Sequence, residues 1–173
     1  MTAVRGSTIG LAAIALLSAI AALWAGNAAA APADLHKLCR QVKNDDTVRP
    51  YQHALHAGTV KAFKKLFPDA KGTPQEAEFE TQANYRCMDG KLFACFVGAN
   101  LPCAKMNAAR DNPGADEFCK TNANADPVPA FATGHDAVYA YKCQNGKAVV
   151  SGTVWALDKR GFATKLWAEV PKR

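Results

Sequence analysis

Apolar positions recur at helical spacing in the first part of the chain. Residues 34–42 follow this rhythm and predict a short helix. A second helix is predicted from Thr59, a candidate N-cap, to Pro68, because the run VKAFKKLF gathers its apolar side chains on one face. A third is expected over residues 113–120, where a proline suits the first turn and acidic residues suit its positive end.

The pattern then changes to strands. Five strands are predicted, at residues 83–88, 91–97, 137–144, 147–157 and 162–170. The pairs Asp89-Gly90 and Asn145-Gly146 separate the first two and the next two, and both pairs favour type I′ hairpin turns. The chain is therefore predicted to be α+β, with a mostly antiparallel sheet of two hairpins plus a C-terminal meander, and two or three short helices.

Strand alternation decides which side chains of the first hairpin share a face. A two-residue turn puts Cys87 opposite Leu92 and Tyr85 opposite Ala94 on one face, with Cys95 on the other. This register forbids a bridge between Cys87 and Cys95.

The second hairpin repeats this arrangement. Tyr141 and Cys143 are expected on its buried face, together with Val150 and, further along, Val154. The repeated Y-x-C-x-[DN]-G-K pattern is thus explained as scaffold: a buried tyrosine, a buried half-cystine and an exposed turn.

Two acidic stretches are interpreted as solvated. Residues 44–47 are predicted to be a polar loop. Glu76, Glu78 and Glu80 alternate along the chain, which is typical of the exposed face of a strand or loop. A glycosidase needs two opposed carboxylates, and this one cluster does not supply them.

The N-terminal residues predict an export signal. Arg5 precedes the apolar stretch Ile9–Ala25, and Ala28 and Ala30 provide small residues before a cleavage site. Cleavage near Ala30 is expected; a retained anchor is the alternative, because the apolar stretch is long enough to span a bilayer. We therefore expect a periplasmic or secreted protein with no membrane span after cleavage.

One domain is expected after residues 1–30 are removed. Residues 31–74 are predicted to form an N-terminal helical segment that packs on the domain, and residues 75–173 its disulfide-rich β-sheet part. Arg5 is the one charged residue of the signal, so the remainder carries 20 Lys and Arg against 15 Asp and Glu, a net charge of about +5. We expect a monomer.

All six cysteines follow the signal, which predicts three disulfides in an oxidising compartment. A zinc site is the rival interpretation, but no C-x2-C pair occurs. The expected pairing is Cys39–Cys87, Cys95–Cys103 and Cys119–Cys143.

Candidate catalytic groups are few. No nucleophile elbow, P-loop or dinucleotide motif is present. His53 and His56 could share a helix face, but no third metal ligand lies near them in the sequence, and a solvated pair is the favoured interpretation. His135 beside Asp136 could act as a base. We assign no catalytic residue, metal or cofactor, and an enzyme stays a possibility that the motifs do not favour.

Basic residues are the leading candidates for binding. They form a helical stripe, Lys61, Lys64 and Lys65, and a second group near the end of the chain, Lys159 and Arg160 with Lys172 and Arg173. Ser151 and Trp155 are further candidate contacts. In an exported protein these would meet anionic envelope polymers or a protein partner rather than nucleic acid.

Four motifs carry a resemblance to known proteins. YRCMDGK (85–91) and YKCQNGK (141–147), with GANLPC (98–103) and TGHD (133–136) between them, resemble exported proteins of Gram-negative bacteria that have no assigned activity.

A second likeness is to the membrane-bound or periplasmic inhibitors of C-type lysozyme. Those β-barrels are similar in their Y-x-C-x-D-G strand, and the counterparts of their contact segments are Ser151-Gly152 and WALDKRG (155–161). A net charge of about +5 would oppose association with a cationic lysozyme.

The sequence thus favours a non-catalytic binding or envelope-associated module. Inhibition of a cell-wall hydrolase such as lysozyme is the first alternative, and a small periplasmic enzyme is the second.

Overall fold

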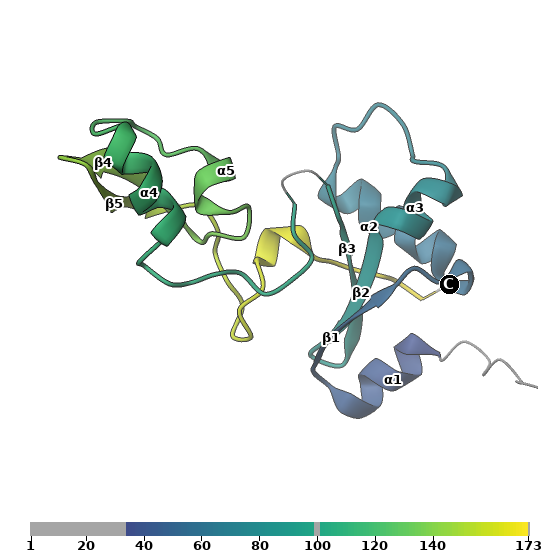
Figure 1. The fold of residues 1–173 in the computed structure, drawn as a ribbon. Coiled ribbons are helices and arrows are strands. Elements are labelled where there is room, and N and C mark those ends of the chain that lie inside the picture. Colours follow the sequence, from purple (N-terminus) through teal and green to yellow (C-terminus); the bar gives the residue numbers. More distant parts are fainter. Residues whose placement is uncertain (1–33, 99–100, 173) are drawn as a thin grey trace, which may run out of the picture. The chain divides into compact units, whose positions relative to one another are not determined.

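The first hairpin lies at the centre of a four-stranded sheet. The computed structural model describes residues 34–98 and 101–172. Its antiparallel strands run in the order β1-β2-β3-β6 (Figure 1): β1 (Asp45–Pro50), β2 (Ala83–Met88), β3 (Lys91–Phe96) and β6 (Ala168–Glu169).

Three helices cover one face of this sheet. They are α1 (Leu35–Val42), α2 (His56–Leu66), which follows the 3-10 turn η1 (His53–Leu55), and α3 (Glu76–Gln82). Leu35 and Phe79 are buried there against Tyr85, Leu92 and other residues of the hairpin.

The second hairpin forms a separate two-stranded sheet. Its strands are β4 (Tyr139–Gln144) and β5 (Lys147–Thr153), and α4 (Pro113–Thr121) and α5 (Ala130–Thr133) accompany them (Figure 1). The Asn112 side chain caps α4 by accepting from the Ala115 N–H at 2.9 Å, and it donates to the Thr133 carbonyl at 2.8 Å, which joins α4 to α5.

Both hairpin predictions are confirmed. Cys87 pairs with Leu92 and Cys143 with Ala148, as the two-residue turns require. The turn residues have positive φ, 49° and 79° in the first turn and 50° and 78° in the second, which is the type I′ pattern. The α+β class and the antiparallel pairing are therefore as predicted.

Two acidic stretches were assigned wrongly from the sequence. Residues 45–50 form the edge strand β1 rather than continuing a loop, and residues 76–82 form helix α3 rather than a strand or loop. In α3 the Glu78 carboxylate accepts from the Gln75 N–H at 2.8 Å, so one glutamate stabilises the helix start. Residues 31–74 thus contain a strand as well as helices.

Three further details differ from prediction. Thr59 is not an N-cap: α2 begins at His56, and the buried Thr59 hydroxyl contacts the Tyr85 hydroxyl at 2.6 Å. The C-terminal strand β6 pairs with β3 and does not extend a meander from β5. Val154 is 54% exposed, because β5 ends at Thr153 and a bulge near Tyr141 shifts the register.

The three disulfides join the predicted partners: Cys39–Cys87, Cys95–Cys103 and Cys119–Cys143. Each bridge lies in a different one of the three hydrophobic clusters. Three disulfides indicate an oxidising, extracytoplasmic location.

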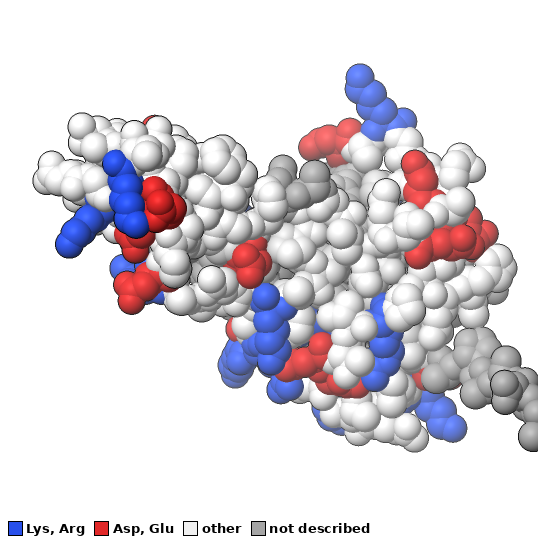
Figure 2. All heavy atoms as spheres, viewed as in Figure 1, with Lys and Arg blue, Asp and Glu red and all other residues white. Residues whose placement is uncertain are grey.

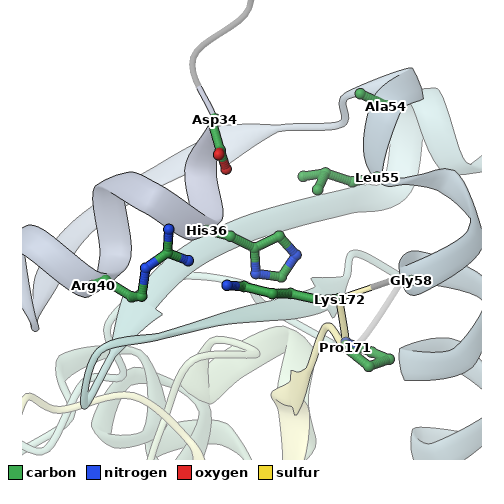
Figure 3. A pocket seen from close by; sticks show the side chains of 8 residues that line it. All are labelled: Asp34, His36, Arg40, Ala54, Leu55, Gly58, Pro171 and Lys172. Carbon is green, nitrogen blue, oxygen red and sulfur yellow. The ribbon is translucent and has the colours of Figure 1, made fainter.

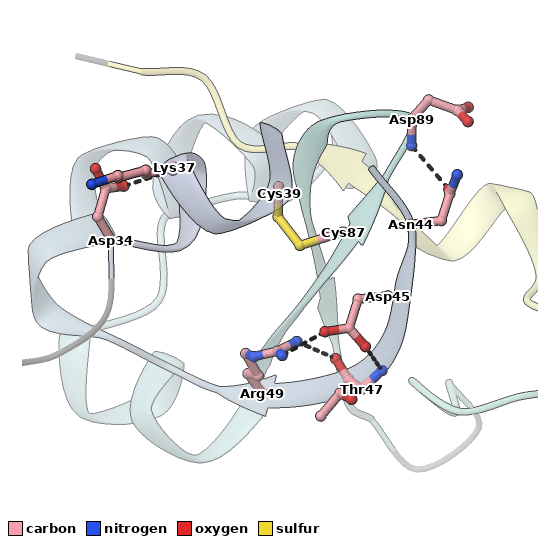
Figure 4. The surroundings of a disulfide bond; sticks show 9 residues. All are labelled: Asp34, Lys37, Cys39, Asn44, Asp45, Thr47, Arg49, Cys87 and Asp89. Atoms are coloured by element: carbon pink, nitrogen blue, oxygen red, sulfur yellow. Dashed lines mark hydrogen bonds and ion pairs between the residues drawn. A yellow bond between two sulfur atoms is a disulfide. The ribbon is translucent and has the colours of Figure 1, made fainter. Parts of the chain in front are cut away.

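The bridge from Cys39 fastens α1 to the first hairpin (Figure 4). The turn after α1 adds two hydrogen bonds to the hairpin's own turn. The Gly90 N–H donates to the Lys43 carbonyl at 2.8 Å, and the Asp89 N–H donates to the Asn44 side chain at 3.1 Å.

A fully buried arginine links the first hairpin to the C-terminal part of the chain. Arg86 points away from the Tyr85 face, and its guanidinium carbon lies 3.8 Å from the centroid of the Phe162 ring and 4.7 Å from that of Trp167. Its Nη2 donates to Asp158, whereas its Nε and Nη1 have no partner among the described residues.

Asp158 is held ionised in this contact. Burial alone would raise its pKa, but hydrogen bonds from Arg86 and from the N–H groups of Phe162 and Arg160 outweigh burial and lower it. A lowered carboxyl pKa stabilises the fold above the unfolded-state pKa, and this contribution is lost as pH falls through the folded-state value.

Helix α2 approaches the C-terminal segment closely at Gly58. A Cβ at this position would lie 2.7 Å from Val170 Cγ1 and 2.8 Å from the Pro171 carbonyl oxygen. The missing side chain therefore lets residues 170–172 pack directly on α2.

We expect Asp158→Ala to lower the free energy of unfolding by about 3 kcal/mol, because it leaves the buried Arg86 charge unpaired. The control is Glu117→Ala: Glu117 pairs with Lys120 on the exposed surface, where solvent screens the pair, and its removal should cost much less. Urea unfolding near neutral pH measures both. Equal losses would show that the Arg86 pair is unimportant.

We expect Gly58→Ala to destabilise the fold by about 1–3 kcal/mol, although alanine favours a helix, because the new methyl group meets a backbone carbonyl. In Gly72→Ala the added Cβ has no atom within 4 Å, and that control should be nearly neutral or slightly stabilising. A gain in melting temperature for Gly58→Ala would contradict the close packing.

Candidate functional site

A hollow of about 240 Å³ lies where α1, η1, α2 and the C-terminal segment meet. Basic side chains from two distant parts of the chain line it: His36 and Arg40 from α1, and Lys172 from the C-terminal segment (Figure 3). In Figure 3 the Arg40 guanidinium, the His36 ring and the Lys172 amine extend toward the same space. Asp34 lies at one edge.

Local folding explains why α1 presents these two side chains. Leu35 and Cys39 are buried against the sheet, so His36 and Arg40, each one position later, lie together on the neighbouring face. The Asp34 carboxylate caps the helix by accepting from the Lys37 N–H at 3.0 Å.

Pairing with β3 fixes the position of the C-terminal segment. β6 pairs with β3, and the Val170 N–H donates to the Leu92 carbonyl at 2.8 Å. Pro171 then packs on Gly58, and this contact brings Lys172 to the hollow.

Burial and neighbouring charges act on the half-buried His36. Burial is the largest cause and lowers the pKa of the imidazole, and Lys172 and Arg40 lower it further. Asp34 and Glu169 act in the opposite direction but do not reverse the shift. The hydrogen bond from the Lys37 N–H lowers the pKa of Asp34, so that carboxylate is ionised at neutral pH.

The hollow has the chemistry of an anion site. Arg40 and Lys172 form no ion pair with any carboxylate in the described part of the chain. A guanidinium offers paired N–H donors to a carboxylate or phosphate, and an ammonium adds a point charge. A second hollow of about 370 Å³ adjoins it and shares His36, Arg40 and Lys172.

The predicted lysine stripe lies apart from these two hollows. Lys61, Lys64 and Lys65 are exposed along α2, and none of them lines either hollow. On the face drawn in Figure 2, basic side chains are interspersed with acidic ones.

Only some of the later predicted contacts, from Ser151 to Arg160, lie together. Lys159 and Arg160 border a hollow of about 470 Å³ whose wall includes Asp89 and Asp158, so its charge is mixed. Arg160 is also paired with Asp46. Ser151 is exposed on β5 and Trp155 is half-buried; neither borders that hollow.

The histidine pair has partners that the sequence did not reveal. Glu76 accepts a hydrogen bond from the Tyr51 hydroxyl at 2.6 Å and contacts His53, and Tyr51 also contacts His56 Nδ1 at 2.8 Å. Because the Tyr51 proton goes to Glu76, the His56 Nδ1–H must be the donor to Tyr51. Burial is the largest cause that raises the pKa of Tyr51, and the hydrogen bond to Glu76 raises it further. These contacts tie α3 to η1 and α2.

We also looked for a metal site among the side chains. Within residues 34–98 and 101–172, no three His, Cys, Asp or Glu side chains are arranged to hold a metal ion. His135, the candidate base, is exposed at a turn beside the partly buried Asp136.

Within residues 34–98 and 101–172, no helix combines the length and apolar character needed to cross a bilayer. The predicted export signal and its cleavage point lie outside the described residues.

The sequence indicated Lys172 as part of the C-terminal basic group, but it assigned no role to His36 or Arg40. The spacing of His36 and Arg40, four apart on one predicted helix, was the available signal. Nothing local indicated that Lys172 would join them, because strand pairing between β3 and β6 brings it there.

No family model, no curated protein and no solved structure matches this chain. The two resemblances drawn from the sequence therefore stay predictions, and the geometry of the chain itself must support any function.

Proposed function

We propose that this protein is a non-catalytic, extracytoplasmic module that binds an anionic ligand between α1 and the C-terminal segment. The observation that carries the proposal is the convergence of Arg40, Lys172 and His36 on one hollow, with neither Arg40 nor Lys172 paired to a described carboxylate. A carboxylate, phosphate or sulfate group would supply the missing acceptor.

The predicted export signal and the three disulfides support the proposed setting of this site. We propose that the signal is cleaved near Ala30 and that the protein acts as a monomer in the periplasm or outside the cell. An anionic group of an envelope polymer, exposed in that compartment, is the proposed natural ligand.

We expect Arg40→Gln to weaken sulfate binding at least about tenfold, since a charge-assisted hydrogen bond contributes about 1.5–3 kcal/mol. Lys64→Gln is the matched control: it removes the same charge from an exposed site outside the hollow and should leave the dissociation constant nearly unchanged. Isothermal titration at constant ionic strength measures both. No sulfate binding by the parent protein, or equal effects of the two variants, would exclude the site.

We expect sulfate to bind more tightly as the pH falls from about 7.5 to about 5.5. Burial lowers the pKa of free His36, and a bound anion favours the imidazolium, so binding takes up a proton. Asp34 stays ionised in this range because its pKa is lowered.

His36→Gln provides the control for this pH dependence. The affinity of that variant should change with pH much less than the affinity of the parent protein. Sulfate keeps its charge over this pH range, whereas phosphate would gain a proton. A change in sulfate affinity with pH therefore reports on the protein. An unchanged slope in His36→Gln would show that His36 is not the group whose protonation strengthens sulfate binding.

A further inference from the structure

A second hollow, remote in sequence from the anion site, lies beside the second hairpin. It has a volume of about 300 Å³, and the two aromatic residues in its wall are Tyr139 and Trp155. Thr133, His135 and Val154 also line it. This volume is at the lower end of small-molecule sites.

The backbone holds the Trp155 side chain at this hollow. The N–H groups of Val154 and Trp155 both donate to the Val138 carbonyl, at 2.8 and 3.4 Å. Val138 is buried in the cluster that contains the Cys95–Cys103 bridge, and Trp155 packs partly against that cluster. The chain beyond β5 is therefore anchored, and the half-exposed indole is presented from a fixed base.

Charge distinguishes this hollow from the anion site. No Lys, Arg, Asp or Glu is among the residues that line it, so the ligand it suits is uncharged. One ring face of Tyr139 is covered by Arg110, whose guanidinium carbon is 5.0 Å from the ring centroid. Trp155 has no aromatic partner among the described residues and is the available platform.

Three residues that line the hollow carry polar side-chain groups without a partner. The Tyr139 hydroxyl, the Trp155 indole N–H and the His135 ring make no side-chain hydrogen bond or ion pair within the part of the chain that the structure describes. A purely apolar ligand that covered these groups would leave them unpaired, which costs free energy. The ligand must therefore combine an apolar face with hydrogen-bonding groups at its edge.

We propose that this hollow binds one ring of an uncharged sugar chain. The C–H face of a pyranose ring carries partial positive charge and suits the negative face of an indole. Its equatorial hydroxyls both donate and accept, and so they suit the phenol, indole and imidazole groups of the lining residues Tyr139, Trp155 and His135. The site is distinct in residues and in charge from the anion hollow and does not depend on it.

The test uses the protein purified with its three disulfides intact and three uncharged probes: maltotriose, cellotriose and N-acetylglucosamine trimer. At least one probe should bind saturably and shift the fluorescence or the NMR signal of the Trp155 indole. Trp155→Ala should weaken that binding about tenfold or more. Phe131→Ala is the matched control, because Phe131 is a 79% exposed aromatic side chain that does not line the hollow.

Several outcomes would overturn the proposal: no binding of any probe at millimolar concentration, equal loss in Trp155→Ala and Phe131→Ala, or unchanged binding in Trp155→Ala. If Trp155→Ala does not fold, the test is made on the parent protein. The NMR signal of the Trp155 indole N–H must then shift as the sugar is added, and an unchanged signal would contradict the proposal. Arg40→Gln should bind the sugar normally. That result would separate this site from the anion site, so failure of either proposal can be recognised by itself.

Discussion

The burial of one charged group, the Arg86 guanidinium, determines where the C-terminal part of the chain lies. Removing a guanidinium from water costs several kcal/mol unless its charge is compensated. The compensating groups are Asp158, Phe162 and Trp167, which all belong to one segment. That segment must therefore fold back onto β2. β6 and Lys172 follow it directly, and Trp155 precedes it by a few residues, so both candidate sites depend on the same buried contact.

The hairpins could be predicted because their signals are local. Asp89-Gly90 and Asn145-Gly146 specify the turn type, the turn fixes the register, and the register decides which side of the strand each cysteine occupies. Excluding a Cys87–Cys95 bridge left Cys87 free to reach a distant partner. The helix carrying Cys39 supplied it, and the remaining cysteines paired over shorter separations.

The parts that could not be predicted depend on contacts distant in sequence. β1 has no buried residue and shows no apolar alternation, since it is an edge strand whose formation depends on pairing with β2. α3 has one buried residue, Phe79, and a single apolar position does not produce the spacing that predicts a helix. β6 is two residues long and is defined by its pairing with β3. The anion site combines α1 with Lys172, and no sequence spacing encodes that proximity.

The net positive charge of the chain does not by itself locate a ligand. Several basic side chains are paired locally, for example in Lys91–Glu169 and Lys105–Asp46. Exposed lysines such as Lys64 are hydrated, and their charge is screened over about 10 Å. Arg40 and Lys172 are exposed as well, but two separately anchored segments hold them over one hollow, beside the half-buried His36. Selectivity there should therefore depend on the geometry that Gly58 and the Cys39–Cys87 bridge maintain, and only weakly on the total charge of the protein.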